Sequence, residues 1–155
     1  MNQEQVRNLF RYIDSVRNEA VKEDIFTQLG FECFHSRNLS RWLDGFNGDL
    51  RQLMDYVNVR RESKYWESLV LSPDGRQLTL TGKAVEGCAC SFADCANPPL
   101  SLCRYCCRKF QQEFFMYLLK KPVTVIITEA FLLGDKRCST VIEIGGSGYK
   151  FSLPI

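Results

Sequence analysis

Apolar residues recur every three or four positions through the first third of the chain, which is the spacing of amphipathic helices. The first two stripes are Val6, Leu9, Phe10, Ile13 and Val16, and then Val21, Ile25, Phe26 and Leu29. Gly30 follows the second stripe and is a typical helix stop. Two shorter stripes are Leu39, Trp42, Leu43 and Phe46, and then Leu50, Leu53, Met54 and Val57. Residues 1–60 are therefore predicted to be helical, with these stripes in the core.

The later part of the chain contains runs rich in aromatic, β-branched and leucine residues, which favour strands. Runs at 65–71 and 77–85 flank Ser72-Pro73-Asp74-Gly75, so they predict a β-hairpin. Runs at 123–133 and 138–144 flank a Gly-Asp-Lys-Arg turn and predict a second one, and 149–153 is a candidate last strand. Between the hairpins, Ser101 can cap a helix from about residue 102 to 119, which Lys121-Pro122 ends.

These elements predict an α+β fold, in which N-terminal helices precede an antiparallel sheet of four to five strands with one long helix packed on it. A chain of 155 residues is most simply a single domain, 1–155. Its helical part is 1–60, and 61–155 holds a hairpin, a cysteine-rich loop, a helix and the second hairpin. The net charge of +2 provides no strong field for nucleic acid or for an anionic membrane, so neither partner is expected.

The N-terminus and the lengths of the apolar runs indicate the cellular compartment. The N-terminus is polar and lacks the apolar region of a signal peptide, and no run approaches the ~20 apolar residues of a membrane span. We therefore expect a cytoplasmic protein. Reducing conditions there disfavour structural disulfides, so clustered cysteines indicate metal binding or redox chemistry.

Cysteines are the most informative residues of the chain, because six of its eight lie between positions 88 and 107. Zinc fits this set best. Cys103 shares a helix face with either Cys106 or Cys107, three and four positions later, and a Cys-Ala-Cys pair in the loop adds two thiols. A tetrahedral thiolate site for Zn²⁺ is therefore predicted. Its ligands are Cys88, Cys90, Cys103 and Cys106, and further candidate ligands are Cys33, Cys95 and Cys107.

The same cysteines allow other interpretations. An iron–sulfur cluster fits the common ligand spacings poorly, and its candidate ligands are Cys90, Cys95, Cys103 and Cys106. A redox or catalytic thiol site, a disulfide network and a set of reduced thiols packed in a core are further alternatives. The positive end of the helix dipole, with three cations nearby, is expected to lower the thiol pKa values. Those cations are Arg104, Arg108 and Lys109.

The second predicted hairpin contains a carboxylate, Glu129, in an otherwise apolar row. Glu129 continues the odd-numbered row that begins at Val123, and an even-length closure of the hairpin places Cys138 on the same face. A carboxylate at the end of an apolar row lies either at an exposed edge or in a pocket, where its pKa would be raised. Glu129 and Cys107 are thus the candidate catalytic residues if the protein is an enzyme of hydrolase or redox type.

Several segments together resemble an uncharacterised bacterial and archaeal family of cysteine-rich small proteins, over about residues 25 to 144. The segments are Leu29-Gly30-Phe31-Glu32-Cys33, Gly48-Asp49-Leu50-Arg51-Gln52-Leu53-Met54, Cys88-Ala-Cys90, Tyr105-Cys106-Cys107, Pro122-Val123-Thr124-Val125, Glu129 and Gly134-Asp135-Lys136-Arg137-Cys138. The C-terminal part is similar to 4-vinyl reductase-type small-molecule-binding domains and to L-2-amino-thiazoline-4-carboxylic acid hydrolase-like proteins. The resemblance implies an α+β domain with a cavity for a metal or an apolar ligand, and it implies no particular reaction.

The predicted function is therefore a zinc-binding domain that acts as a ligand-binding, sensor or structural module. The partner predicted with it is a small apolar ligand. A homodimer is also expected, because at least one of the strands 65–71 and 149–153 should be an unpaired sheet edge.

Overall fold

The computed structural model of the chain describes residues 3–84, Cys90 and residues 99–145. Helices precede and interrupt an antiparallel sheet, so the predicted α+β class is confirmed. The helices are α1 (Gln3–Asp14), α2 (Glu19–Ser36), α3 (Leu39–Asp44), α4 (Leu50–Asn58), η2 (Leu102–Cys107), α5 (Arg108–Leu119) and η3 (Phe131–Leu133). The strands are β1 (Trp66–Leu71), β2 (Gln77–Gly82), β3 (Val123–Glu129) and β4 (Ser139–Ile144). Within the described residues, no helix combines the length and apolarity that a bilayer crossing needs.

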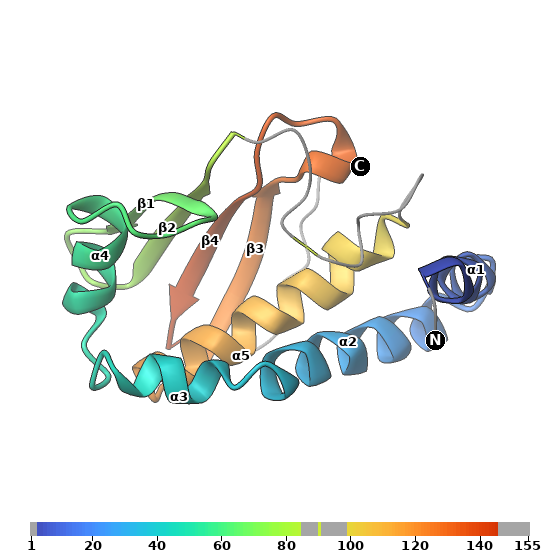
Figure 1. Cartoon of the computed structure of the whole chain (residues 1–155), viewed down its shortest axis with the longest axis horizontal. Helices are drawn as coiled ribbons and strands as arrows, with labels where there is room; N and C mark the ends of the chain where they lie inside the picture. The colour runs from blue at the N-terminus through green and yellow to red at the C-terminus, as the bar shows by residue number, and fades with distance from the viewer. Residues whose placement is uncertain (1–2, 85–89, 91–98, 146–155) are drawn as a thin grey trace.

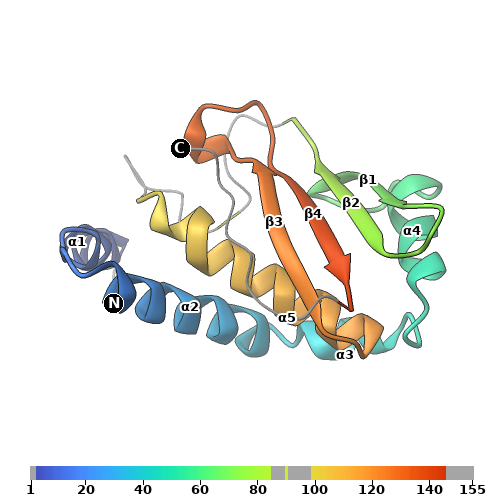
Figure 2. The same ribbon diagram turned by 180° about the vertical axis from the view of Figure 1, so that it is seen from behind.

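The four strands form one antiparallel sheet in the order β1-β2-β4-β3. Helix α5 crosses one face of this sheet, and α2 runs along the opposite side of α5 (Figure 1). Seen from behind, β3 and β4 lie in front of α5, so α5 covers only one of their two faces (Figure 2). The helix that carries the thiols is therefore packed between the sheet and α2.

The main core fills the space between α5 and the covered face of the sheet. Strand residues with the same side-chain direction align across the sheet, as in the row Leu69, Leu80, Thr140 and Ile127. Phe115 of α5 is fully buried against this face and belongs to the same cluster as Leu69 and Leu80. The alternation predicted for the strands thus forms one apolar face, on which the apolar stripe of α5 packs.

Gly30 does not end a helix, contrary to the sequence prediction. Helix α2 continues through it to Ser36, so Cys33 lies within the helix and not beyond its end. The reason for the glycine is tertiary: a Cβ at position 30 would overlap the Cys106 carbonyl oxygen and come within 2.9 Å of the Lys109 Cβ. Gly30 therefore lets α2 cross the first turns of the thiol-bearing helix at very short range.

The predicted helix from about residue 102 to 119 is present, but its first turns are π-helical. Residues Leu102–Cys107 form the π-helix η2, and α5 continues it without interruption. Ser101 does not cap it, because its hydroxyl donates instead to the Asp14 carboxylate of α1 at 2.8 Å. Short π-helical turns occur often at functional sites, since they change which side chains share a face.

The second hairpin also differs from its prediction. The first strand was predicted to span 123–133, but β3 ends at Glu129. Phe131–Leu133 form a short 3-10 turn. A bulge interrupts the pairing, because Ile127 lies opposite Thr140 whereas Glu129 lies opposite the adjacent Ser139. Glu129 therefore leaves the apolar row and is exposed on the other face, where the Ser139 hydroxyl donates to it at 2.5 Å.

Strand β1 is an edge of the sheet, so the prediction that at least one of the strands 65–71 and 149–153 is an edge is confirmed. The strand predicted at 149–153 lies outside the described residues. The Asn58 side chain, at the end of α4, caps part of this edge. Its amide donates to the Leu69 carbonyl at 2.7 Å and accepts from the Leu69 N–H at 2.8 Å. The Asn58 side chain therefore bonds the N–H and the C=O of Leu69 as the backbone of a neighbouring strand would. At Leu69 the edge is not available for pairing with another strand.

Candidate thiol site

Thiols from several elements come together beside the start of α5. Three lie on η2, one comes from α2, and Cys138 comes from the connection between η3 and β4. Cys90 is the sixth, because its charge contributes to the raised pKa values of four of the others. We refer to this group as the thiol cluster: Cys33, Cys90, Cys103, Cys106, Cys107 and Cys138. Cys33 and Cys90, which are 57 residues apart in the sequence, thus share one electrostatic environment.

Three of these thiols accept hydrogen bonds from N–H groups. The Gln111 amide donates to the Cys107 sulfur at 3.3 Å, and the Phe131 backbone N–H donates to the Cys138 sulfur at 3.4 Å. The backbone N–H of Leu132 donates to the Cys103 sulfur. Two of the three donors belong to the turn η3. Such bonds stabilise a thiolate over a thiol, because the donor dipole points toward the negative sulfur.

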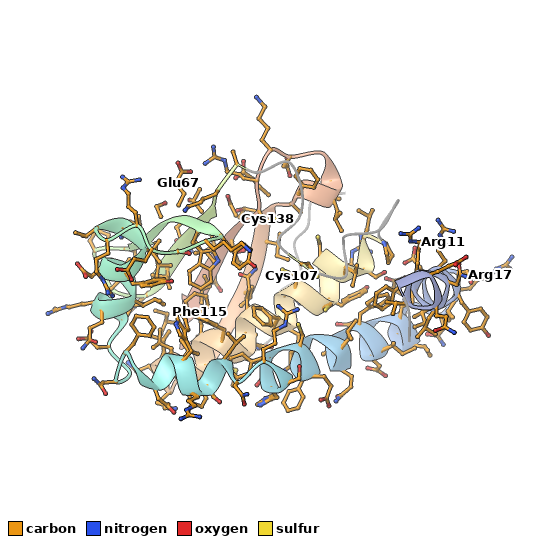
Figure 3. All side chains as sticks on the ribbon, in the orientation of Figure 1. Arg11, Arg17, Glu67, Cys107, Phe115 and Cys138 are labelled. Atoms are coloured by element: carbon orange, nitrogen blue, oxygen red, sulfur yellow. The ribbon has the colours of Figure 1, made fainter. Side chains whose placement is uncertain are left out.

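The thiols of the π-helix η2 face in two directions, toward the sheet and toward α2. Cys103 and Cys107 pack with Ile127 and Ala130 at the end of β3, close to the turn that carries Cys138. Figure 3 labels Cys107 and Cys138 between the start of α5 and the sheet. Cys106 points the other way, into a cluster with Phe26 and other residues of α1 and α2. Cys103 and Cys107 therefore form a pair on one face, and Cys106 is not part of it.

The expectation of lowered thiol pKa values is wrong. Burial raises the pKa of Cys103 and Cys106, and neighbouring thiols raise it further. Burial likewise raises the pKa of Cys107, to about 12, although the Gln111 hydrogen bond opposes this shift. Without a positive ion to offset burial, these thiols are protonated at neutral pH.

The three nearby cations do not compensate for burial, because each pairs with a carboxylate. Arg104 and Arg108 face α2, where they pair with Glu19 at 3.6 Å and Glu23 at 3.2 Å. Lys109 pairs with Glu113 at 2.7 Å, one turn along α5. The pairs of Arg104 and Arg108 attach the thiol-bearing helix to α2, and all three pairs occupy the positive charge with a carboxylate.

Gln111 was not identified from the sequence, although it lies four positions after Cys107 and so shares its helix face. Its side chain is only 9% exposed, and its amide oxygen is buried without a hydrogen-bond partner among the described residues. A buried polar atom of this kind costs about 1–3 kcal/mol. The buried oxygen lowers the stability of the fold, so the contribution of this glutamine lies in its amide donor, which contacts the Cys107 sulfur.

The two candidate catalytic residues are not brought together as an acid–base pair. Glu129 is exposed, on the face opposite the apolar row, so among the described residues it fits the exposed-edge alternative and not the pocket alternative. Cys107 has the raised pKa described above, which is the opposite of an activated nucleophile. A catalytic role of Glu129 or Cys107 therefore stays a prediction, which the exposure of Glu129 and the raised pKa of Cys107 do not favour.

The predicted zinc ligands are brought together only in part. Cys90, Cys103 and Cys106 belong to the thiol cluster, whereas Cys88 and Cys95 lie outside the described residues. In the described part of the chain, no three Cys, His, Asp or Glu side chains are positioned to hold one metal ion. The donor chemistry fits zinc, but the described side chains do not form a closed coordination shell.

Comparisons with known proteins support the fold alone. No family model matches the chain, and none of the curated proteins matches it. Among solved structures, the chain is similar to a trafficking protein particle complex subunit 3 from Naegleria fowleri, covalently bound to palmitic acid. The match has a TM-score of 0.53 and 11% sequence identity, and it covers 92% of each chain. At this identity the likeness is evidence of shared architecture only.

Proposed function

We propose that the protein is a zinc-binding domain whose metal joins the start of α5 to the turn between β3 and β4. The observation that carries the proposal is the set of three thiols that accept N–H hydrogen bonds and lie in one electrostatic environment: Cys103, Cys107 and Cys138. Bonds of this kind orient metal-bound thiolates and are a regular feature of metal sites. With Cys90 as the fourth thiol, the donor set is that of a structural zinc site.

This set revises the sequence prediction in two positions. Cys107 replaces Cys106, since Cys106 faces the apolar cluster on the α2 side. Cys138 is added because its sulfur accepts from the same turn that donates to Cys103. Cys88 remains an alternative to Cys90 as the loop ligand. Because the described side chains are not in place for coordination, metal uptake includes rotation of the thiols toward one another.

The raised thiol pKa values agree with a metal-binding role better than with a reactive one. A bound zinc ion supplies positive charge at the sulfur atoms, so the thiols lose their protons on binding. In the metal-free protein the same thiols stay neutral and unreactive. Binding free energies of thiolate zinc sites reach on the order of 10 kcal/mol, comparable with the net stability of a whole domain. Such a metal would stabilise the protein strongly.

The experiment that tests the proposal compares two cysteine variants in the zinc-free and zinc-loaded protein. We expect about one zinc ion per chain in wild type, and cobalt substitution should give the intense absorption of thiolate-to-metal charge transfer. Cys138→Ser should lose most of its zinc affinity and its zinc-dependent gain in melting temperature. Cys33→Ser is the matched control, because Cys33 belongs to the thiol cluster but is not one of the three thiols that accept N–H hydrogen bonds. A wild-type protein that binds no zinc, or equal affinities in the two variants, would contradict the proposal.

A second candidate function is binding of an apolar acyl chain. The trafficking subunit with a similar fold is covalently bound to palmitic acid. In the present chain, Cys106 offers a thiol inside an apolar cluster with Phe10 and Phe26, which is a suitable environment for an acyl chain. Intact mass measurement before and after hydroxylamine tests this candidate. Loss of one fatty acyl mass, absent in Cys106→Ser, would favour it over zinc binding.

A further inference from the structure

The structure contains a pocket that the thiol chemistry does not use, where α4, β1 and the residues after β2 meet. Its volume is about 310 Å³, and it is lined by Val57, Arg61, Trp66, Glu67, Lys83 and Ala84. This volume lies at the lower end of the range for small-molecule sites. We propose that this pocket binds a small, planar organic anion of the aromatic carboxylate class.

The sign of the ligand charge follows from the charged side chains of the lining. Arg61 and Lys83 are cations, and neither forms an ion pair with a carboxylate of the described residues. Glu67 is the one acidic residue of the lining, and Arg137 neutralises it at 2.6 Å. Two positive charges therefore remain at the pocket, and a bound anion would offset them.

The Lys83 ammonium is held in a defined position. It donates to the Ser63 carbonyl oxygen at 2.6 Å, and this bond uses one of its three N–H groups. The other two are available to a ligand. Arg61 adds a planar guanidinium, which matches a carboxylate with two parallel N–H donors. The pair thus suits a carboxylate better than a neutral group of the same shape.

The shape of the ligand follows from the rest of the lining. Val57 and Ala84 are apolar, and Trp66 contributes an aromatic side chain. The Trp66 ring is fixed by the core, since it stacks on Phe115 with centroids 6.3 Å apart and meets Phe114 edge-on at 5.2 Å. A fixed aromatic side chain beside small apolar residues favours a flat, rigid partner, because little side-chain freedom is lost on binding.

The backbone at Arg61 makes one substitution informative. Arg61 has φ = 53°, in the left-handed region that glycine and asparagine adopt most readily. Arg61→Asn therefore removes the guanidinium while retaining a residue that suits this backbone conformation. Its effect on binding can be separated from any effect on folding.

The test uses Trp66 as the reporter in a Trp42→Phe background, which leaves it as the only tryptophan of the chain's two. Benzoate should produce a saturable change in fluorescence, and benzamide and acetate should each bind at least about tenfold more weakly, a loss of about 1.4 kcal/mol. Arg61→Asn and Lys83→Met should weaken benzoate binding by a similar factor. Arg51→Asn, on the exposed surface of α4 and outside the lining, is the matched control and should leave binding unchanged.

Three outcomes would overturn the proposal: no saturable response to benzoate, equal binding of benzamide or acetate, or an unchanged affinity in Arg61→Asn. Circular dichroism and thermal melts establish that each variant is folded. If Lys83→Met loses stability through its bond to Ser63, Arg61→Asn alone decides the question. The inference does not depend on zinc binding, and all titrations are repeated with chelator present.

Discussion

At the scale of single residues, Gln111 links the stability of the protein to its proposed metal. Its amide donates to the Cys107 sulfur, and its oxygen is buried without a partner among the described residues. The two ends of this side chain therefore have opposite effects. The donor end favours a thiolate at Cys107, whereas the oxygen carries a desolvation cost in the metal-free fold.

Gln111→Leu should separate these effects. We expect the zinc-free variant to be as stable as wild type or slightly more stable, because the unpaired oxygen is removed. Its zinc affinity should fall about 10–100-fold, the usual loss when a group that orients a metal ligand is removed. Chemical denaturation and competitive zinc titration measure the two quantities. Gln112→Leu is the matched control, since Gln112 donates to the Val123 carbonyl and should affect stability without affecting zinc.

At the scale of elements, the crossing of α2 over η2 determines where the thiols lie. The crossing is held by ion pairs from Arg104 and Arg108 to α2 and by a hydrogen bond of 2.5 Å from the Tyr105 hydroxyl to Glu19. Gly30 allows the close approach itself. These contacts fix the direction in which Cys103 and Cys107 face the sheet.

Gly30→Ala tests this crossing, and two effects of opposite sign compete in it. Alanine favours a helix interior over glycine by about 1 kcal/mol. The overlap of its Cβ with the Cys106 carbonyl cannot be relieved by a side-chain rotation, and overpacking of this kind costs about 1–3 kcal/mol. We therefore expect a net loss of stability and a lower melting temperature. Gln28→Ala, at an exposed position of α2, should change the melting temperature little. A Gly30→Ala variant that melts above wild type would show that the helices are not in close contact.

At the scale of the whole molecule, the thiol cluster makes stability depend on pH, and the proposed zinc would reverse the sign of this dependence. In the zinc-free protein the pKa of Cys107 is raised from an ordinary value of 9.0 to about 12, so the folded state holds this proton more tightly than the unfolded state does. The stabilisation is complete below pH 9 and is lost as the pH rises toward 12. With zinc bound as we propose, protons would compete with the metal for the thiolates, so stability would be lost as the pH falls.

We therefore predict that the free energy of unfolding of the zinc-free protein decreases above pH 9, by up to about 1.4 kcal/mol per pH unit for each such thiol. Urea denaturation from pH 7 to 10.5, with chelator and with zinc, measures both trends. Cys107→Ala should reduce the alkaline slope, and Cys33→Ala, whose thiol has a smaller upward pKa shift, serves as the comparison. A zinc-free stability that rises above pH 9 would contradict the raised pKa values.

Local patterns along the chain predicted most of the secondary structure of the described residues. Helical periodicity located α1 to α4, and turn residues between β-branched runs located both hairpins, because these signals are local. The sequence also indicated a thiol-based site near residues 88–107, and the structure describes Cys90 and the three η2 thiols of that region together. The homodimer and the identity of the metal stay predictions.

The packing of distant elements determines which residues complete the site and what their chemistry is. Gly30 reads as a helix stop in sequence, yet its role is set by a helix that lies 76 residues further along the chain. The bulge before Glu129 removed a carboxylate from the apolar row, and the turn η3 brought Cys138 to thiols that lie 31 or more residues before it. Thiol pKa values depend on burial and on neighbours from other elements, which periodicity and spacing do not report. Local patterns determine local structure, whereas burial, close approach and convergence exist only after the chain has folded.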